Sequence, residues 1–250
     1  MRRKGARLRR GVTRRALLPF GALLLLLGAP MAHAERLAPA DEPALVQVPK
    51  QLALKILRGG GEGTQFIGSG FAWVVKGKAY AITNFHVAEK GLPAEPAPGG
   101  LYVGYPGPVH WHAARHMLGV PGADLAVIET AVESPLANPL AVGAAALGET
   151  VYSISYDERD YQQAAPLVHR GTVVGVVRAL FPSSILLIRP PVPPDAVKVY
   201  VVDGSDCLHG ASGSMLLNSR GELFAINAGR IEGGLCIAVA AEEMQRALAR

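Results

Sequence analysis

The sequence predicts an all-β protein, built as an antiparallel sandwich or as a pair of antiparallel barrels. Three observations predict this fold class. Short apolar or alternating runs recur along most of the chain, Gly, Pro, Asn and Asp separate them, and helical periodicity is scarce after residue 34. Many short strands at such spacing are typical of sandwiches and barrels, where each strand turns one face to a shared core.

The expected strands follow one another with turn residues between them. In chain order they are Ala53–Leu57, Gly70–Val75, Ala79–Thr83, Leu125–Glu129, Thr150–Ser155, Gly171–Val177, Ser184–Arg189, Val197–Val202, Ser214–Leu217, Leu223–Asn227 and Leu235–Val239. Near the end, Glu242–Leu248 favours a short amphipathic helix. Two segments rich in Pro and Gly, Gly91–Gly107 and Pro190–Pro194, are expected to be loops. A seam near Ser134–Pro139 would divide the chain into two halves, residues 51–135 and 136–250.

The first 34 residues have the features of a secretory signal. Residues 1–15 hold eight basic side chains and no acid, and Ala16–Leu27 is mostly apolar. Ala32-His33-Ala34 then places small residues where a signal peptidase cleaves. We therefore expect a signal peptide over residues 1–34, with cleavage after Ala34.

The signal predicts a periplasmic or secreted protein, which would begin with a flexible leader over residues 35–50. Thr13–Leu18 (TRRALL) resembles a twin-arginine export signal, and an ordinary Sec signal is the alternative. The apolar stretch of the signal spans about 12 residues, whereas a membrane span needs about 20. No longer apolar stretch follows, so we expect no membrane span in the mature form.

Removal of the signal reverses the sign of the net charge. The full chain carries +5, but without the basic residues of the signal it has 17 basic against 20 acidic side chains, a net charge of −3. This balance indicates no nucleic-acid partner.

Cys207 and Cys236 are expected to form a disulfide, because an exported chain folds in an oxidising compartment. Closing a loop of this size would contribute roughly 3–4 kcal/mol to the free energy of unfolding. Two buried free thiols are the alternative.

The strongest candidate for chemistry is the turn Gly210-Ala211-Ser212-Gly213, within SDCLHGASGSMLLNSRGELFAIN. Such a turn between strands can present a serine hydroxyl beside backbone N–H groups. Gly210 has no side chain to cover its own N–H, which could face a ligand together with the N–H of Ser212. A serine hydroxyl still needs a base, so the turn alone does not define a site.

Two upstream segments supply a base and an acid. KAYAITNFHVAEK places His86 just past an expected strand, and GADLAVIET places Asp124 just before another. Each residue taken singly is more often structural, but with Ser212 they form the set of a Ser–His–Asp triad. In that triad the histidine is the general base and then the general acid, and the aspartate orients the imidazole.

Chain order excludes two other arrangements of a serine hydrolase. The α/β-hydrolase order needs an acid and a histidine after the serine, and neither an aspartate nor a histidine follows Ser212. The subtilisin order needs an aspartate before the histidine, where only Asp41 of the expected leader is available. The order His, Asp, Ser remains.

TNFHVAEK, GADLAVIET and HGASGSMLLNSRGELFAIN together resemble the three signature blocks of trypsin-like serine proteases. The chain is most similar to the bacterial HtrA/Deg branch without a PDZ domain, and GGLCIAVAAEEMQRAL resembles that branch's closing strand and helix. The resemblance covers most of residues 66–250. It implies a chymotrypsin-like fold of two antiparallel Greek-key β-barrels, over residues 51–135 and 136–250, with a short C-terminal helix.

The resemblance also implies the site and its chemistry. His86, Asp124 and Ser212 would be the triad, and the N–H groups of Gly210 and Ser212 the oxyanion hole. The activity would be serine-type hydrolysis of peptide bonds in polypeptide substrates, with no cofactor and no metal. Cys207 and Cys236 flank Ser212 much as a specificity-pocket disulfide does in chymotrypsin relatives.

Two other functions stay open on the sequence. Ser214 and Met215 stand where the family commonly has Gly and Pro, so a binding or quality-control module with little or no turnover is the alternative. A metal-dependent function would use the three histidines of VHWHAARH. No fourth ligand is evident there, and we expect a solvated loop. Asp206 is expected to be a turn or capping residue rather than the acid of a specificity pocket. The sequence carries no signal for an oligomeric state.

Overall fold

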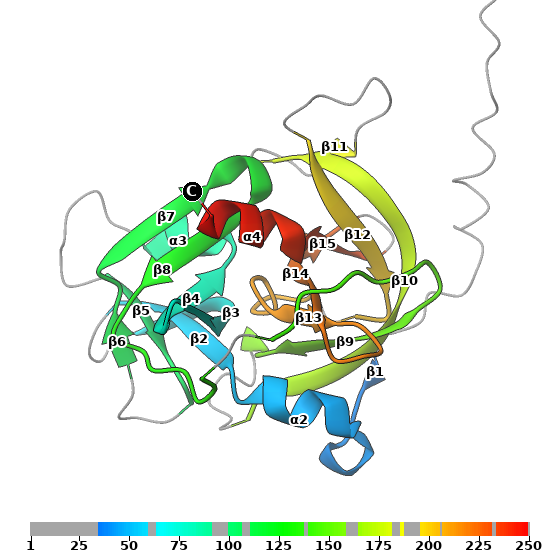
Figure 1. The fold of residues 1–250 in the computed structure, drawn as a ribbon, viewed down its shortest axis with the longest axis horizontal. Coiled ribbons are helices and arrows are strands. Elements are labelled where there is room, and N and C mark those ends of the chain that lie inside the picture. Colours follow the sequence, from blue (N-terminus) through cyan, green and yellow to red (C-terminus); the bar gives the residue numbers. More distant parts are fainter. Residues whose placement is uncertain are drawn as a thin grey trace, which may run out of the picture. The chain divides into compact units, whose positions relative to one another are not determined.

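The computed structural model describes the chain from Glu35 to Ala249 with several gaps. The described residues are 35–59, 64–91, 100–106, 111–137, 140–158, 165–181, 186–187, 196–205, 207–231 and 234–249. They form two antiparallel sheets with few helices (Figure 1), which confirms the all-β, chymotrypsin-like fold class. The expected signal peptide and the Pro190–Pro194 loop lie outside them. Within the described ranges, no helix is long and apolar enough to span a bilayer.

The first sheet is a curled ribbon of seven strands that carries the N-terminal part of the candidate site. Its order is β6 (Trp111–Ala113), β5 (Leu101–Gly104), β2 (Ala53–Arg58), β3 (Gln65–Val75), β4 (Lys78–Thr83), β8 (Leu125–Glu129) and β7 (His116–Val120). A tight turn joins β3 to β4, with positive φ at Lys76 (49°) and Gly77 (77°). Two consecutive positive φ values match the right-handed twist of the hairpin.

The second sheet closes into a barrel. Its strands run β10 (Leu167–Leu180), β12 (Val197–Asp203), β15 (Cys236–Ala240), β14 (Leu223–Arg230), β13 (Met215–Leu217) and β9 (Thr150–Ser155). Strand β10 pairs with β12 along its second half and with β9 along its first, which completes the ring. Two short strands, β1 (Glu35–Arg36) and β11 (Leu186–Leu187), add to β10.

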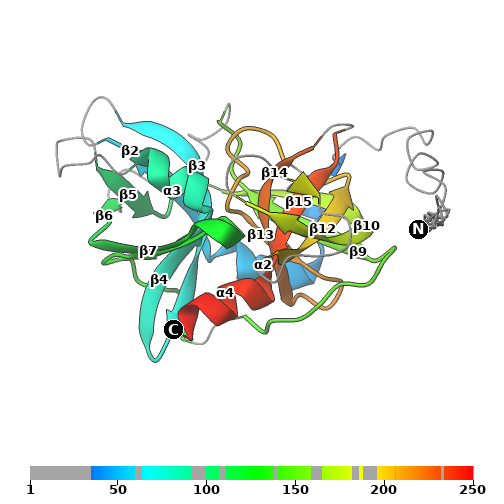
Figure 2. The same cartoon turned by 90° about the horizontal axis from the view of Figure 1, so that it is seen from above.

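One hydrophobic core joins the two sheets, which lie side by side in Figure 2. Fully buried side chains of both sheets belong to it, among them Ile56, Phe71 and Ile128 of the first and Ile154, Met215 and Val239 of the second. Because side chains of both sheets share this core, the junction between the sheets is packed.

The C-terminal helix α4 (Ala241–Leu248) follows β15 and reaches the first sheet (Figures 1 and 2). Ala241, Met244 and Ala247 form its buried face at helical spacing. Two glutamates in the first turn and Arg246 in the last complement the helix dipole. The predicted helix is thus present, one residue longer at its start.

Some segments have more regular structure than the sequence indicates. Residues 35–50, expected to be a leader, contain β1, the 3-10 helix η2 (Pro39–Asp41) and α2 (Ala44–Lys50), with Val46 fully buried. Strand β5 lies inside the expected loop Gly91–Gly107, which is a correction. Leu101 and Val103 are both buried there, an alternation hidden by the Gly and Pro residues on either side.

Candidate active site

Strand register brings His86 and Asp124 together although 38 residues separate them. β4 pairs with β8 so that Thr83 lies opposite Ala126. The end of β4 therefore meets the start of β8. After Thr83 the chain turns into α3 (Phe85–Gly91), and His86 lies in its first turn rather than on a simple strand end.

The carboxylate of Asp124 binds both the ring and the backbone of His86. The imidazole Nδ1 lies 2.9 Å from Oδ2 and 3.1 Å from Oδ1, and the His86 N–H donates to Oδ1 at 3.0 Å. The Asp124 side chain is 8% exposed, whereas that of His86 is 38% exposed. A buried carboxylate facing Nδ1 favours the tautomer with the proton on Nδ1, which leaves Nε2 on the open side as an acceptor.

The backbone of Asp124 is shaped to present that carboxylate. Asp124 follows the 3-10 helix η3 (Pro121–Ala123) and has left-handed angles, φ 49° and ψ 42°. Aspartate tolerates this region better than most residues. The Asp124 carbonyl accepts hydrogen bonds from the Phe85 N–H at 3.1 Å and from Asn84 Nδ2 at 3.0 Å. Asn84, Phe85 and His86 thus hold both the carbonyl group and the carboxylate of Asp124.

Ser212 lies in the turn between β12 and β13, and two glycines with positive φ surround it. Gly210 has φ 99° and Gly213 has φ 86°. A Cβ on Gly210 would lie 2.6 Å from the Phe66 ring and 2.7 Å from the Glu158 nitrogen, and one on Gly213 would overlap Ser69 O and Thr83 Oγ1. Both positions therefore need glycine for backbone angle and for space.

The peptide groups of this turn are oriented through their carbonyls. His209 O accepts from the Glu158 N–H at 3.1 Å, and Ala211 O accepts from the Ser214 N–H at 3.1 Å and from Asn227 Nδ2 at 3.3 Å. In a trans peptide the N–H points opposite to the carbonyl. The N–H groups of Gly210 and Ser212 consequently point away from these partners.

A short chain of hydrogen bonds links the turn to the end of β4. Thr83 Oγ1 donates to Ser69 O at 2.7 Å, and the Ser69 N–H donates to Ser212 O at 2.9 Å. Thr83 stands three residues before His86, so the serine turn packs against the same strand end that carries the histidine. These bonds connect the backbone of Ser212 to the strand end that precedes His86.

The junction beneath the turn is buried. Lys55, opposite Ser69 on β2, is 3% exposed, and its Nζ lies 4.9 Å from the centre of the Tyr156 ring. Burial lowers the pKa of Lys55 and raises the pKa of the Tyr156 hydroxyl above its usual range. Hydrogen bonds in such an environment hold the backbone more firmly than hydrogen bonds exposed to water.

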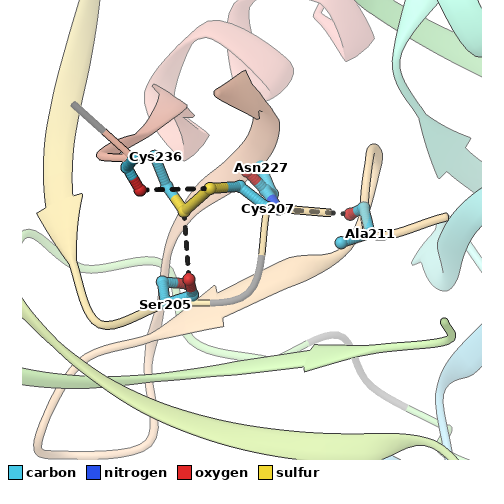
Figure 3. Close-up of a disulfide and its surroundings, with 6 residues drawn as sticks. Ser205, Cys207, Ala211, Asn227 and Cys236 are labelled. Carbon is cyan, nitrogen blue, oxygen red and sulfur yellow. Dashed lines mark hydrogen bonds between the residues drawn. A yellow bond between two sulfur atoms is a disulfide. The ribbon is translucent and has the colours of Figure 1, made fainter. Parts of the chain in front are cut away.

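The predicted disulfide is present. Cys207 and Cys236 are bonded, with 5.5 Å between their Cα atoms, and Figure 3 shows the bond near Ala211 and Asn227. Cys236 is fully buried on β15, and the Ser205 carbonyl oxygen lies 3.2 Å from its sulfur. The bond ties the segment just before Gly210 to the barrel. A loop of this size contributes about 3–4 kcal/mol.

A pocket of about 260 Å³ borders Gly210. Its lining is mostly polar and comes from the first sheet and from the segments that follow β9 and β12: Arg58, Gln65, Phe66, Ile67, Glu158, His209 and Gly210. The turn thus has open space on the side of Gly210, where a substrate segment could lie.

The two departures from the family pattern fit the local structure. Met215 is the first residue of β13 and pairs with Ile226 of β14 and Ile154 of β9. A methionine keeps the backbone N–H that proline would lack at a strand position with partners on both sides. Ser214 is fully buried, and its N–H closes the turn onto Ala211 O.

The remaining candidates of the sequence do not form a second site in the described chain. His112 lies on β6 and His116 begins β7, so the segment is a pair of strands rather than the expected loop. His110 and Asp206 lie outside the described residues. Within the described ranges, no group of three or more His, Cys, Asp or Glu could hold a metal ion.

Sequence reasoning missed Ser69, Asn227 and Tyr156, which contact the turn from other segments. Ser69 is in Gly68-Ser69-Gly70, and it lies outside the expected strand, which starts at Gly70 whereas β3 starts five residues earlier at Gln65. Its place between two glycines is the one local signal, because a strand interrupted by glycine is typical of a close backbone approach.

Comparison with known proteins agrees with the fold and with the class of enzyme. Residues 68–226 match the trypsin-like peptidase domain family. The chain therefore belongs to the trypsin-like peptidases, a family of serine-type endopeptidases. A search of curated proteins finds no match.

Three solved structures illustrate the similarity in fold. The active form of the Rv3671c protease from M. tuberculosis superposes with a TM-score of 0.61 at 18% identity, covering 94% of this chain and 93% of that one. The MamO protease domain from Magnetospirillum magneticum gives 0.60 at 20% identity, over 80% and 97%. The HtrA-type protease AlgW with a tripeptide gives 0.58 at 16% identity, over 82% and 61%.

Proposed function

We propose that this chain is an exported serine endopeptidase that cleaves polypeptides through an acyl-enzyme, with Ser212 as nucleophile. The observation that carries the proposal is the hydrogen bond between His86 Nδ1 and the buried Asp124 carboxylate, beside the turn of Ser212. A lone histidine at a sheet end would not need a buried carboxylate aimed at its Nδ1. This pairing is what a general base requires.

The proposed reaction has two halves. In the first, Ser212 Oγ attacks the scissile carbonyl carbon while its proton passes to His86 Nε2, and the imidazolium then gives that proton to the leaving amine as the C–N bond breaks. In the second, water attacks the acyl-enzyme ester, gives a proton to His86, and Ser212 leaves with that proton. Asp124 stabilises the imidazolium in both halves.

The proposed oxyanion hole is formed by the N–H groups of Gly210 and Ser212. Their peptide groups are fixed by the bonds to His209 O and Ala211 O, so the two donors need no rearrangement when charge develops. Preorganised donors of this kind stabilise the tetrahedral intermediate more than the substrate.

Export is a separate part of the proposal. The charged and apolar pattern of residues 1–34 supports it, and so does the Cys207–Cys236 disulfide, because such bonds persist in oxidising compartments. We propose a periplasmic or secreted location. N-terminal sequencing of the mature protein should begin at Glu35, and a mature protein that retains residues 1–34 would contradict it.

A peptide-library cleavage profile tests the activity. Wild-type protein should cleave a defined subset of peptides, and Ser212→Ala should lose all cleavage while keeping its melting temperature. Persistent binding of an unfolded polypeptide by both proteins, with no cleavage by wild type, would instead support the binding or quality-control module.

A further inference from the structure

We propose that Ser69 is a positioning residue that clamps the serine turn from the opposite sheet and sets the geometry of its N–H donors. The inference rests on the proposed function, since it concerns the oxyanion hole of that reaction. Ser69 is on β3, whereas the turn follows β12, and 141 residues separate Ser69 from Gly210.

Ser69 binds two carbonyls of the turn at once. Its Oγ donates to Gly210 O at 2.7 Å, and its backbone N–H donates to Ser212 O at 2.9 Å. These carbonyls belong to the peptide groups on either side of the one that carries the Ser212 N–H. Fixing both neighbours leaves that central peptide group little freedom to rotate.

The hydroxyl of Ser69 has a defined direction. The Tyr156 N–H donates to Ser69 Oγ at 2.9 Å, so the oxygen accepts there and its single proton goes to Gly210 O. Ser69 is 1% exposed, which removes competition from water. One side chain thus connects β3, the end of β9 and the serine turn.

Ser69 is itself held by a rigid support. β3 is an inner strand, with Lys55 of β2 opposite Ser69 and β4 on its other side. Thr83 Oγ1 binds Ser69 O at 2.7 Å. Positions on paired strands hold functional groups more precisely than loops do.

A residue of this kind acts on the transition state more than on substrate binding. The oxyanion donors bind charge that develops only during reaction, so a looser turn lowers kcat and leaves KM nearly unchanged. Removing an oxyanion donor outright costs about 10²–10³-fold in kcat. Losing the clamp misaligns a donor without deleting it, so we expect about a tenfold loss.

The test compares Ser69→Ala with Ser69→Thr, which keeps the hydroxyl, and with Ser153→Ala. Ser153 is a matched control, because it is also a 1% exposed strand serine and its Oγ has no hydrogen-bond partner among the described residues. Each protein is titrated with a fluorophosphonate, so that kcat is expressed per active serine. Ser69→Ala should show a kcat about tenfold lower at unchanged KM. Ser69→Thr should recover most of the lost activity, and Ser153→Ala should match wild type.

An unchanged kcat in folded Ser69→Ala, or an equal loss in Ser153→Ala, would overturn the clamp while leaving the proposed function intact. A wild type that neither labels nor cleaves would overturn both. If Ser69→Ala does not fold, Thr83→Val removes the bond to Ser69 O at nearly constant volume. Thr83→Val should lower kcat by less than the tenfold expected for Ser69→Ala, again at unchanged KM. A wild-type kcat in this variant would contradict the proposal.

Discussion

The histidine side and the serine side of the candidate site are built in different ways. In the first sheet, two side chains meet directly, His86 and Asp124. In the second, backbone carbonyls of the turn are bound from three separate segments, by the Glu158 N–H, Asn227 Nδ2 and Ser69. The first half therefore depends on the chemical identity of two residues. The second depends on backbone shape, which several residues maintain together.

The largest effect should come from the histidine side. Asp124→Asn removes the charge that stabilises the imidazolium and favours the wrong tautomer, so we expect kcat to fall by about 10⁴-fold. Steady-state kinetics on a peptide substrate would measure it. Asp41→Asn, in the exposed 3-10 helix η2, is the matched control and should keep full activity. A loss below tenfold in Asp124→Asn would mean that this pair is structural.

On the serine side, Gly213→Ala should lower stability as well as activity. The methyl group would meet Ser69 O and Thr83 at a residue with φ 86°, so we expect a loss of about 2–4 kcal/mol in the free energy of unfolding. Urea denaturation would measure it. Gly148→Ala has a similar φ of 82° with nothing within 4 Å of the added carbon, and should cost only about 1 kcal/mol. Equal losses would show that close packing at Gly213 contributes nothing.

The smallest expected effect lies away from both halves, at Glu149. Its carboxylate accepts hydrogen bonds from the Ser219 hydroxyl, the Ala146 N–H and the Ser219 N–H, and so joins two loops of the barrel. Burial raises the pKa of Glu149, but these bonds together with the positive charge of Arg220 lower it by more, so that its pKa lies below the ordinary 4.5. Because the folded-state pKa is depressed, this stabilisation is complete above the unfolded pKa and is lost as pH falls through the folded value.

Glu149→Gln should therefore lower the free energy of unfolding by about 0.5–1 kcal/mol at pH 7, a range that allows for solvent screening. The difference from wild type should shrink as the pH falls below 4.5. Thermal melts at several pH values would show it, with the exposed Glu133→Gln as control. A difference that stays constant down to pH 3 would contradict the assignment.

The two halves also differ in how well the sequence predicts them. Leu125–Glu129 and Thr150–Ser155 form strands with the predicted bounds, since alternation and turn residues are local signals. His86 and Asp124 were predicted because they flank such strands, His86 three residues after β4 and Asp124 directly before β8. Ser69 and Tyr156 were not predicted, because their role depends on contacts that are distant in sequence. Ser69 binds Gly210, 141 positions away, and Tyr156 binds Ser69, 87 positions away. Strand β5 was not predicted, because the Pro and Gly residues on either side of it obscure the alternation of its two buried residues, Leu101 and Val103.

In the proposed mechanism, His86 activates Ser212 as the nucleophile. Wild-type protein treated with a fluorophosphonate and digested for peptide mapping should carry the label on Ser212 alone. His86→Ala should be labelled far more slowly, and Ser212→Ala not at all, with both variants folded. Labelling of Ser212 at the same rate in His86→Ala, or labelling that persists in Ser212→Ala, would contradict these two roles.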